Sequence, residues 1–284
     1  MDSVLVTGAN GQLGNVLRHC TEGMDGFRFY FTDVDTLDIC DKVQVGDFVR
    51  SHDIGTVVNC AAYTAVDRAE DDVETCTRIN CDAVRTIGEI AASTGAGVIH
   101  ISTDYVFDGC GSRPYRETDA THPVSVYGKT KLAGERALSD TCENSIILRT
   151  AWLYSGTGTN FVKTMLRLGK ERETVGIVAD QHGTPTYAGD LADVIKTILT
   201  KGLMPPGIYH YANEGECTWY DFAVKIFELA GLPCTVRPLS TPEYPTRAPR
   251  PAYSVLDKTK IKETLSIQIP PWETSLKKSM VNGQ

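Results

Sequence analysis

The chain of 284 residues lacks the features that mark membrane, secreted or nucleic-acid-binding proteins. No window approaches the roughly 18 unbroken apolar residues of a membrane span. The first residues, MDSVLVTGAN, carry neither a basic stretch nor a long apolar run, so we expect no secretory signal peptide. Basic residues are too few for a nucleic acid polymer to be an expected partner, because 28 Lys and Arg stand against 36 Asp and Glu.

Closely spaced cysteine pairs are also missing, although the chain has nine cysteines. Zinc ribbons and redox motifs both need the C-x-x-C spacing. Scattered cysteines without a signal peptide are typical of reduced packing residues. We therefore expect a cytoplasmic protein with no membrane association, and the composition (42% hydrophobic, 23% charged) is that of a globular one.

The first half of the chain alternates short apolar runs with helical patterns. Helices are expected at 12–20 and 82–93, and strands at 3–7, 28–32, 56–62, 97–102 and 145–150, with a shorter sixth at 175–179. Near-continuous apolar strands separated by helices predict a buried parallel sheet covered on both faces. The expected fold class is therefore α/β, a Rossmann-type doubly wound sheet.

The last third of the chain differs, because it is rich in proline and aromatic residues (MPPGIYHY, EYPTRAPRPAY, QIPPWE). One amphipathic helix is expected there, at 220–230. We expect 1–150 to form an NAD(P)-binding domain whose sheet is completed by parts of 173–215. Residues 151–284 then form mainly a smaller substrate-binding domain.

A glycine-rich turn, TGANGQLG, follows the first strand and opens the first helix. Gly8 permits the tight turn, Gly11 lets the backbone approach a pyrophosphate, and Gly14 lets the helix pack closely on the sheet. The helix N-terminus adds free N–H groups and a positive dipole end. We expect this turn to bind a dinucleotide through Gly8, Asn10, Gly11, Gln12, Leu13 and Gly14.

Asp33 closes the second strand, 22 residues after Gly11. A carboxylate there accepts hydrogen bonds from the adenosine ribose hydroxyls and repels a 2′-phosphate. No Lys or Arg follows it immediately, so we expect NADH to compete at least equally with NADPH. A plain loop aspartate is the alternative.

Tyr127 and Lys131 form a Tyr-x-x-x-Lys pair at the start of an expected helix. Residues four apart share one helix face, so the ammonium of Lys131 is expected near the phenol. At about 6 Å and an effective dielectric of about 20, this charge lowers the phenol pKa by about two units. Tyr127 is then a proton donor to a carbonyl near neutral pH, although such a pair alone is common by chance.

Two strand ends complete the expected site, since ligands of open α/β sheets bind beyond the carboxyl ends of strands. Thr103, in ISTDYVF, is placed there to hydrogen-bond a substrate oxygen, or alternatively to cap a turn. The third strand ends in NCAAYT, where we expect the nicotinamide half of the cofactor. The residues expected to border it are Ala61, Ala62, Tyr63 and Thr64.

The spacing T-G-x-x-G-x-x-G, followed by the strand-end threonine and the Tyr-Lys helix, resembles the extended short-chain dehydrogenase/reductase family. The resemblance implies an NAD(P)H-dependent reductase with an acidic residue bordering the adenine, a position that Asp38 and Ile39 match. It also implies that Asn80 braces the site; an ordinary helix asparagine with its own partners is an equal alternative.

Seven segments narrow the resemblance: GANGQLG, NCAAYTAVDRAE, ISTDYVFDG, VYGKTKLAGE, RTAWLYSGTGTNFVKTML, DQHGTPT and RPAYSVLD. From residue 3 to 272 the chain resembles the dTDP-4-dehydrorhamnose reductase family. The resemblance implies that NADH or NADPH reduces the C4 ketone of dTDP-4-dehydro-L-rhamnose to give dTDP-L-rhamnose.

The same resemblance assigns roles within the site. Thr103 and Asp104 contact the sugar and Tyr127 protonates its C4 oxygen. Lys131 binds the nicotinamide ribose and tunes Tyr127. Trp152 is expected to pack on the substrate. Without the resemblance, an ordinary core tryptophan would be the favoured interpretation. Arg250 fits a diphosphate contact because its fork pairs two phosphate oxygens, a solvated surface arginine being the alternative.

Some relatives in this family are Mg²⁺-dependent dimers held through acidic residues, but position 15 is Asn and the chain ends in SMVNGQ. We therefore expect no metal, and a monomer or weak homodimer. Two other functions share the fold: a nucleotide-sugar epimerase or dehydratase, and the non-catalytic regulatory subunit of methionine adenosyltransferase, which has a Y-G-K-T-K segment. Thr103, Asp33 and TAVDRAE favour the reductase over the regulatory subunit.

Overall fold

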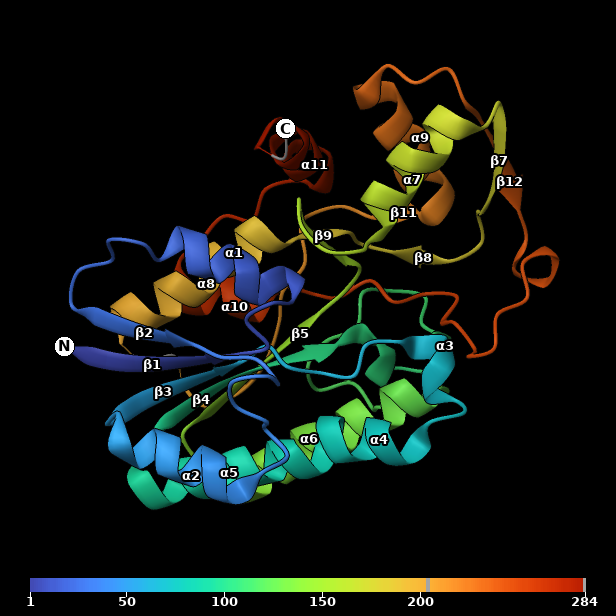
Figure 1. Cartoon of the computed structure of the whole chain (residues 1–284). Coiled ribbons are helices and arrows are strands. Elements are labelled where there is room, and N and C mark those ends of the chain that lie inside the picture. Colours follow the sequence, from blue (N-terminus) through green and yellow to red (C-terminus); the bar gives the residue numbers. More distant parts are fainter. Residues whose placement is uncertain (203–204, 283–284) are drawn as a thin grey trace.

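The computed structural model describes residues 1–202 and 205–282. Its centre is a six-stranded sheet in which every neighbouring pair is parallel, in the order β10-β5-β4-β3-β1-β2 (Figure 1). The strand order reverses direction at β1 and β3, which is where doubly wound sheets bind ligands. The strands are β1 (Asp2–Thr7), β2 (Phe27–Phe31), β3 (Ile54–Asn59), β4 (Gly97–Thr103), β5 (Ser145–Thr150) and β10 (Gly207–His210).

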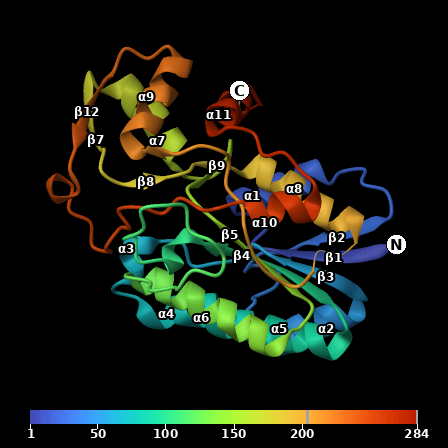
Figure 2. The same ribbon diagram turned by 180° about the vertical axis from the view of Figure 1, so that it is seen from behind.

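Helices cover both faces of this sheet (Figures 1 and 2). Val4 and Val6 of β1 pack toward one set of helices and Leu5 toward the other, so both faces are apolar. This confirms the expected α/β Rossmann fold. One layer holds α1 (Gln12–Cys20), α8 (Ala188–Lys201) and α10 (Thr259–Leu265), and the other α2 (Lys42–Ser51), α5 (Ala83–Thr94) and α6 (Val126–Thr141).

A second, smaller cluster of elements has its own apolar core and lies beyond the carboxyl ends of the strands (Figure 1). The Thr218–Asp221 capping box begins α9 one residue before the expected start. The cluster comprises β6 (Leu153–Tyr154), α7 (Phe161–Glu171), β7 (Thr174–Val178), β8 (His182–Gly183), β9 (Thr186–Tyr187), β11 (Cys217–Thr218), α9 (Trp219–Ala230), β12 (Thr235–Leu239) and α11 (Trp272–Asn282).

The placement of 175–179 as the sixth strand is wrong. This segment forms β7, which pairs with β12 in a separate two-stranded sheet, and β10 takes the sixth place in the main sheet. Both segments are short apolar runs, and the sequence alone does not distinguish their partners.

The remaining elements are short helical segments. They are α3 (Val66–Ala69), α4 (Val73–Thr77), η1 (Arg78–Asp82), η2 (Asp104–Val106) and η3 (Thr241–Glu243), of which η1 is a π-helical turn. Among the described residues, no helix is both long and apolar enough to cross a lipid bilayer.

Candidate active site

The glycine turn between β1 and α1 is compact because no side chain would fit at Gly8 or Gly14. Gly8 has a φ of +65°, and a Cβ there would lie 2.6 Å from the backbone N of Ala61. A Cβ on Gly14 would lie 2.4 Å from the carbonyl oxygen of Gly8. Gly11 caps α1 without a side-chain hydrogen bond, so the first N–H groups of the helix are free for an anion.

The side chains of this turn differ in what they offer. Leu13 is buried in the core, so only its backbone can face a ligand. Gln12 is tied to the second cluster instead: its Oε1 accepts from Asn160 Nδ2 at 2.9 Å and from Ser155 Oγ at 3.2 Å. Gln12 thereby joins the glycine turn to the segment that follows β6.

Asp33 lies at the end of β2, directly beside the glycine turn. Its Oδ2 accepts from the backbone N of Asn10 at 2.8 Å, and its Oδ1 accepts from the backbone N of Val34 at 2.9 Å. The carboxylate is thus fixed at the edge where the adenosine ribose is expected. Asp38 accepts from the backbone N of Cys40 at 2.9 Å, while Ile39 is buried against the core.

The segment after β3 is held by Asn80. Asn80 Oδ1 accepts from the backbone N of Tyr63 at 2.9 Å, and its Nδ2 donates to the Tyr63 carbonyl at 3.1 Å. Asn80 sits in the π-helical turn η1, and π-turns often mark functional positions. This bidentate contact fixes the backbone of the predicted nicotinamide-side segment, Ala61, Ala62, Tyr63 and Thr64.

Tyr127 and Lys131 project from the first two turns of α6. The helix begins after Ser125, whose Oγ accepts from the backbone N of Gly128 at 3.1 Å. Lys131 is buried, and its Nζ donates to the carbonyl oxygen of Ile101 at 2.7 Å. Tyr127 is half-buried, and its ring meets that of Tyr105 edge-on at 5.7 Å.

The expected lowering of the Tyr127 pKa by Lys131 is wrong for this structure. Burial raises the pKa of Tyr127 above its usual value, and an interaction with the Thr103 side chain offsets this only in part. Burial also lowers the pKa of Lys131 to about 8. Loss of contact with water therefore decides the ionisation of both groups in this structure.

Asp104 is a buried carboxylate with one unused oxygen. Thr103 Oγ1 donates to its Oδ1 at 3.0 Å, whereas no group in residues 1–202 and 205–282 hydrogen-bonds its Oδ2. Burial raises the pKa of Asp104 to about 6. A buried, unsatisfied acceptor is costly, so Oδ2 is suited to receive a hydroxyl of a bound ligand.

Trp152 follows β5 in a strained conformation, with a φ of +47°. Its ring stacks on that of Trp219, with centroids 3.6 Å apart and planes 11° apart. A Cβ on Gly183 would lie 2.5 Å from the Trp152 ring, so that glycine makes room for it. The strain and the tight packing hold the indole in one place at the edge of the smaller cluster.

Arg250 is paired within the chain. Its guanidinium donates to Asp67 Oδ2 at 2.7 Å, and Asp67 Oδ1 accepts from the backbone N of Ala248 at 3.0 Å. Arg247 makes a second ion pair with Asp71. These contacts join the loop before Pro251 to α3, so a diphosphate would have to share or replace Asp67 as the partner of Arg250.

Sequence reasoning missed the polar groups that surround Lys131. His100 Nε2 lies 3.4 Å from Lys131 Nζ, and Glu135 is paired with Arg149 at 2.7 Å, both of them buried. The signals were present, since Glu135 follows Lys131 by four residues and His100 precedes Ile101. Among the described residues, no three His, Cys, Asp or Glu side chains gather as a metal site.

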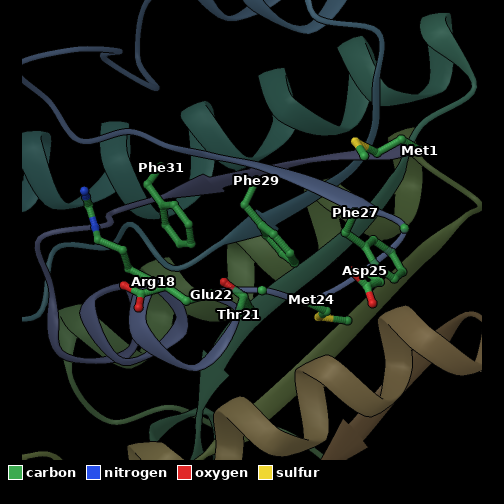
Figure 3. A pocket seen from close by; sticks show the side chains of 11 residues that line it. Met1, Arg18, Thr21, Glu22, Met24, Asp25, Phe27, Phe29 and Phe31 are labelled. Carbon is green, nitrogen blue, oxygen red and sulfur yellow. The ribbon is translucent and has the colours of Figure 1, made fainter.

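A hollow of about 450 Å³ lies elsewhere, along β2 and the end of α1 (Figure 3). Phe27, Phe29 and Phe31 line it together with Arg18 and Met1. None of the predicted site residues lines it, so it is not the place where the site chemistry is assembled.

Comparison with known proteins agrees with this geometry. The family model described as RmlD substrate binding domain matches residues 1–284. The dTDP-4-dehydrorhamnose reductase of Aggregatibacter actinomycetemcomitans is 43% identical over 288 residues, with 98% of both chains covered.

Solved structures give the same result. A dTDP-4-dehydrorhamnose reductase from Clostridium acetobutylicum is 41% identical with a TM-score of 0.95, and 99% of both chains is covered. One from Bacillus anthracis, solved in complex with NADP, is 39% identical with a TM-score of 0.94 and the same coverage. The chain therefore belongs to the dTDP-4-dehydrorhamnose reductase family.

Proposed function

We propose that the chain reduces the C4 ketone of dTDP-4-dehydro-L-rhamnose with NADH or NADPH, giving dTDP-L-rhamnose. Membership of the family makes it a nicotinamide-dependent oxidoreductase. One observation carries the proposal: the free N-terminus of α1, the Tyr127–Lys131 face of α6 and the unsatisfied Asp104 all lie at the carboxyl ends of the parallel strands.

The residues present fit a dinucleotide. The glycine turn presents the uncapped N-terminus of α1 to a pyrophosphate, and Asp33 lies where it can accept ribose hydroxyls. Asn80 holds the segment at Tyr63 that would border the nicotinamide. When bound, the cofactor supplies the hydride that reduces the carbonyl carbon.

The chain supplies the proton. As negative charge develops on the C4 oxygen, the Tyr127 hydroxyl gives up its proton to that oxygen. The Thr103 hydroxyl turns its single hydrogen from Asp104 Oδ1 to the same oxygen and holds that oxygen in place. The ammonium of Lys131 then returns a proton to the phenolate. A buried phenol with a raised pKa keeps its proton until the substrate oxygen becomes the stronger base.

We assign the sugar and diphosphate to residues from both halves of the chain. Asp104 Oδ2 accepts a sugar hydroxyl, the strained Trp152 packs on the sugar ring, and Arg250 turns from Asp67 toward a diphosphate oxygen. We accordingly propose that 1–150 binds the cofactor and that 151–284 mainly binds the substrate, although β10 belongs to the main sheet.

The test is to follow oxidation of NADH or NADPH with the ketosugar made in situ by the enzymes that precede this step. We expect consumption of one reduced cofactor for each dTDP-L-rhamnose formed. A tightly retained cofactor with no net oxidation would instead indicate an epimerase. No sugar turnover, together with capture of methionine adenosyltransferase, would indicate the regulatory subunit.

Replacing Asp33 with alanine is expected to shift the ratio of kcat/KM for NADPH over NADH upward by about tenfold. The variant removes a carboxylate that faces the 2′ position and repels a 2′-phosphate. Asp35→Ala is the matched control, because it removes the same charge from an exposed position two residues away. An unchanged ratio in Asp33→Ala would show that Asp33 is not at the ribose.

Asp104→Asn is expected to raise KM for the ketosugar by about tenfold while the Kd for the cofactor stays the same. The pKa of Asp104 is about 6, so its carboxylate is charged above that pH and accepts the sugar hydroxyl best there. In the unaltered protein KM should rise as pH falls below about 6, and this dependence should vanish in the variant. Equal KM values for the two proteins at pH 7 would remove Asp104 from the sugar site.

A further inference from the structure

A row of buried polar side chains crosses the main sheet and ends at Lys131. Thr7, Asn59 and His100 are register partners on β1, β3 and β4, so their side chains point to the same face. That face is covered by α5 and α6. Each of the three is at most 1% exposed. Polar groups are rarely buried in line without a defined hydrogen-bond pattern.

The pattern fixes which atom of Asn59 faces which neighbour. Its Oδ1 lies 3.2 Å from the backbone N of Ala61, which can only donate, and it accepts from Thr7 Oγ1 at 2.7 Å. The other amide atom, Nδ2, therefore faces His100 Nδ1, at 3.0 Å. Because an amide nitrogen only donates, Nδ1 of His100 must accept.

The tautomer of His100 follows from this. A neutral imidazole whose Nδ1 accepts carries its hydrogen on Nε2. Burial and the proximity of Lys131 hold the pKa of His100 well below its usual value, so the ring is neutral. Its Nε2–H then points at Lys131 Nζ, 3.4 Å away.

This contact distinguishes the two forms of Lys131. The ammonium has three donors and no acceptor, so the Nε2–H donor of His100 has nothing to bind there and destabilises the charged form. The neutral amine has a lone pair that can accept from Nε2–H while one amine hydrogen still donates to the Ile101 carbonyl. Among the remaining titratable neighbours, Glu135 favours the ammonium. Burial raises the pKa of the Cys60 and Cys76 thiols, so these two groups stay neutral and add no charge beside Lys131.

We propose that His100 is a positioning residue of the reduction, which stabilises the amine left on Lys131 once the lysine has returned its proton to Tyr127. The proposal rests on the proposed function. The proton that Tyr127 regains leaves Nζ, the electron pair of the broken N–H bond stays on Nζ, and that pair accepts from His100 Nε2–H. Asn59 acts on Lys131 only through His100, because its Nδ2 holds His100 in the tautomer that can donate from Nε2.

The first test is the tautomer itself, measured in the unliganded protein by long-range ¹H–¹⁵N correlation with labelled histidine. We expect His100 to carry its hydrogen on Nε2 at neutral pH. His210 is an internal control of equal burial with the opposite tautomer, since its Nδ1 faces the carbonyl oxygen of Tyr115 at 3.0 Å. A hydrogen on Nδ1 of His100 would overturn the proposal even if no variant could be prepared.

The second test is His100→Asn. The asparagine Oδ1 takes the place of Nδ1 and still accepts from Asn59, whereas the donor to Lys131 is lost. We expect the pKa of Lys131 Nζ, followed by ¹⁵N-lysine NMR without ligand, to rise by about one unit. The alkaline limb of kcat should move upward equally, kcat should fall about tenfold, and the Kd for NADPH should change less than about threefold.

His210→Asn is the matched control, because it makes the same change at an equally buried histidine beside Arg149. It should leave both the Lys131 titration and the alkaline limb unmoved. An unshifted Lys131 titration in folded His100→Asn, or an equal shift in His210→Asn, would refute the role of His100. If the wild-type protein turns over no ketosugar, the reduction is refuted, whereas the tautomer and the Lys131 titration still report whether His100 controls the lysine.

Discussion

Replacing Tyr127 with phenylalanine is expected to lower kcat for ketosugar reduction by roughly 10²–10⁴-fold, the range typical of losing a general acid. The variant deletes one hydroxyl and keeps the ring that packs edge-on against Tyr105. The fold should therefore persist. The Kd for the cofactor should barely change, since the proposed anchors are the glycine turn, Asp33 and Lys131. Steady-state kinetics and cofactor titration measure the two effects separately.

Tyr105→Phe is the matched control for this change. It removes a hydroxyl from the neighbouring ring, and burial raises the pKa of that phenol as well. We expect its kcat to stay within about threefold of the unaltered protein, because the phenol has no part in the proposed proton transfer. A folded Tyr127→Phe protein with near-normal turnover would remove Tyr127 from the mechanism.

The Tyr127 pKa shows where sequence reasoning reaches its limit. Spacing alone predicts that Tyr127 and Lys131 share a helix face, and both do project from the start of α6. Spacing does not predict the burial of either group, and burial decides their ionisation. Helix periodicity predicts which residues share a face of one helix. The burial of a side chain, and so the shift of its pKa, depends on every element packed around that helix.

The parts of the site that the sequence predicts are local. The glycine turn could be predicted because Gly8, Gly11 and Gly14 lie within one strand–turn–helix unit. The structure leaves no room for a side chain at Gly8 and Gly14, and a Cβ on Gly11 would lie 3.1 Å from the carbonyl oxygen of Gly8. Asp33 could be placed because it ends the very next strand. Its contact with the backbone of Asn10 follows from that short connection.

The parts that the sequence does not predict depend on long-range pairing. Asn59 meets His100 because β3 and β4 pair in one particular register, which the apolar pattern of a fully buried strand does not specify. Arg250 meets Asp67 across 183 residues of chain. The stacking of Trp152 on Trp219 likewise needs the position of α9 relative to the end of β5.

The same limit explains the error over β7. Parallel strands buried on both faces are recognised by apolar runs, and 175–179 is such a run. It pairs along one edge with β12 in the smaller cluster. The choice between β7 and β10 as the sixth main strand is made by tertiary packing, since β10 leads directly into Tyr211, which is buried among α8 and α10.

Lys131→Met is expected to impair chemistry and cofactor binding together. Methionine keeps the apolar stem but deletes the charge and the donors that we propose serve the nicotinamide ribose and Tyr127. We expect kcat to fall by at least about tenfold, and the Kd for the cofactor to rise by about tenfold, the size of one charge-assisted hydrogen bond. Tyr127→Phe should lack the binding defect, so the two variants separate chemistry from binding.

The pH dependence gives a sharper outcome. The pKa of Lys131 is about 8 against 10.5 for a free lysine, so the ammonium, which we propose returns a proton to Tyr127, is lost as pH rises through about 8. In the unaltered protein kcat should fall through that range. In Lys131→Met this limb should vanish, and any residual rate should decline only at higher pH, where the phenol of Tyr127 ionises.

Stability should change in the opposite direction to activity. The pKa of Lys131 is lower in the folded protein than in the unfolded chain, so its ammonium lowers the free energy of unfolding. This loss of stability is complete below about pH 8, and it disappears above pH 10.5, where the lysine is neutral in both states. Lys131→Met removes that cost, while Glu135 keeps its ion pair with Arg149. We expect the free energy of unfolding at pH 7 to rise by on the order of 1–3 kcal/mol, measured by urea denaturation. A less stable variant with normal cofactor affinity would show that Lys131 serves the core and not the site.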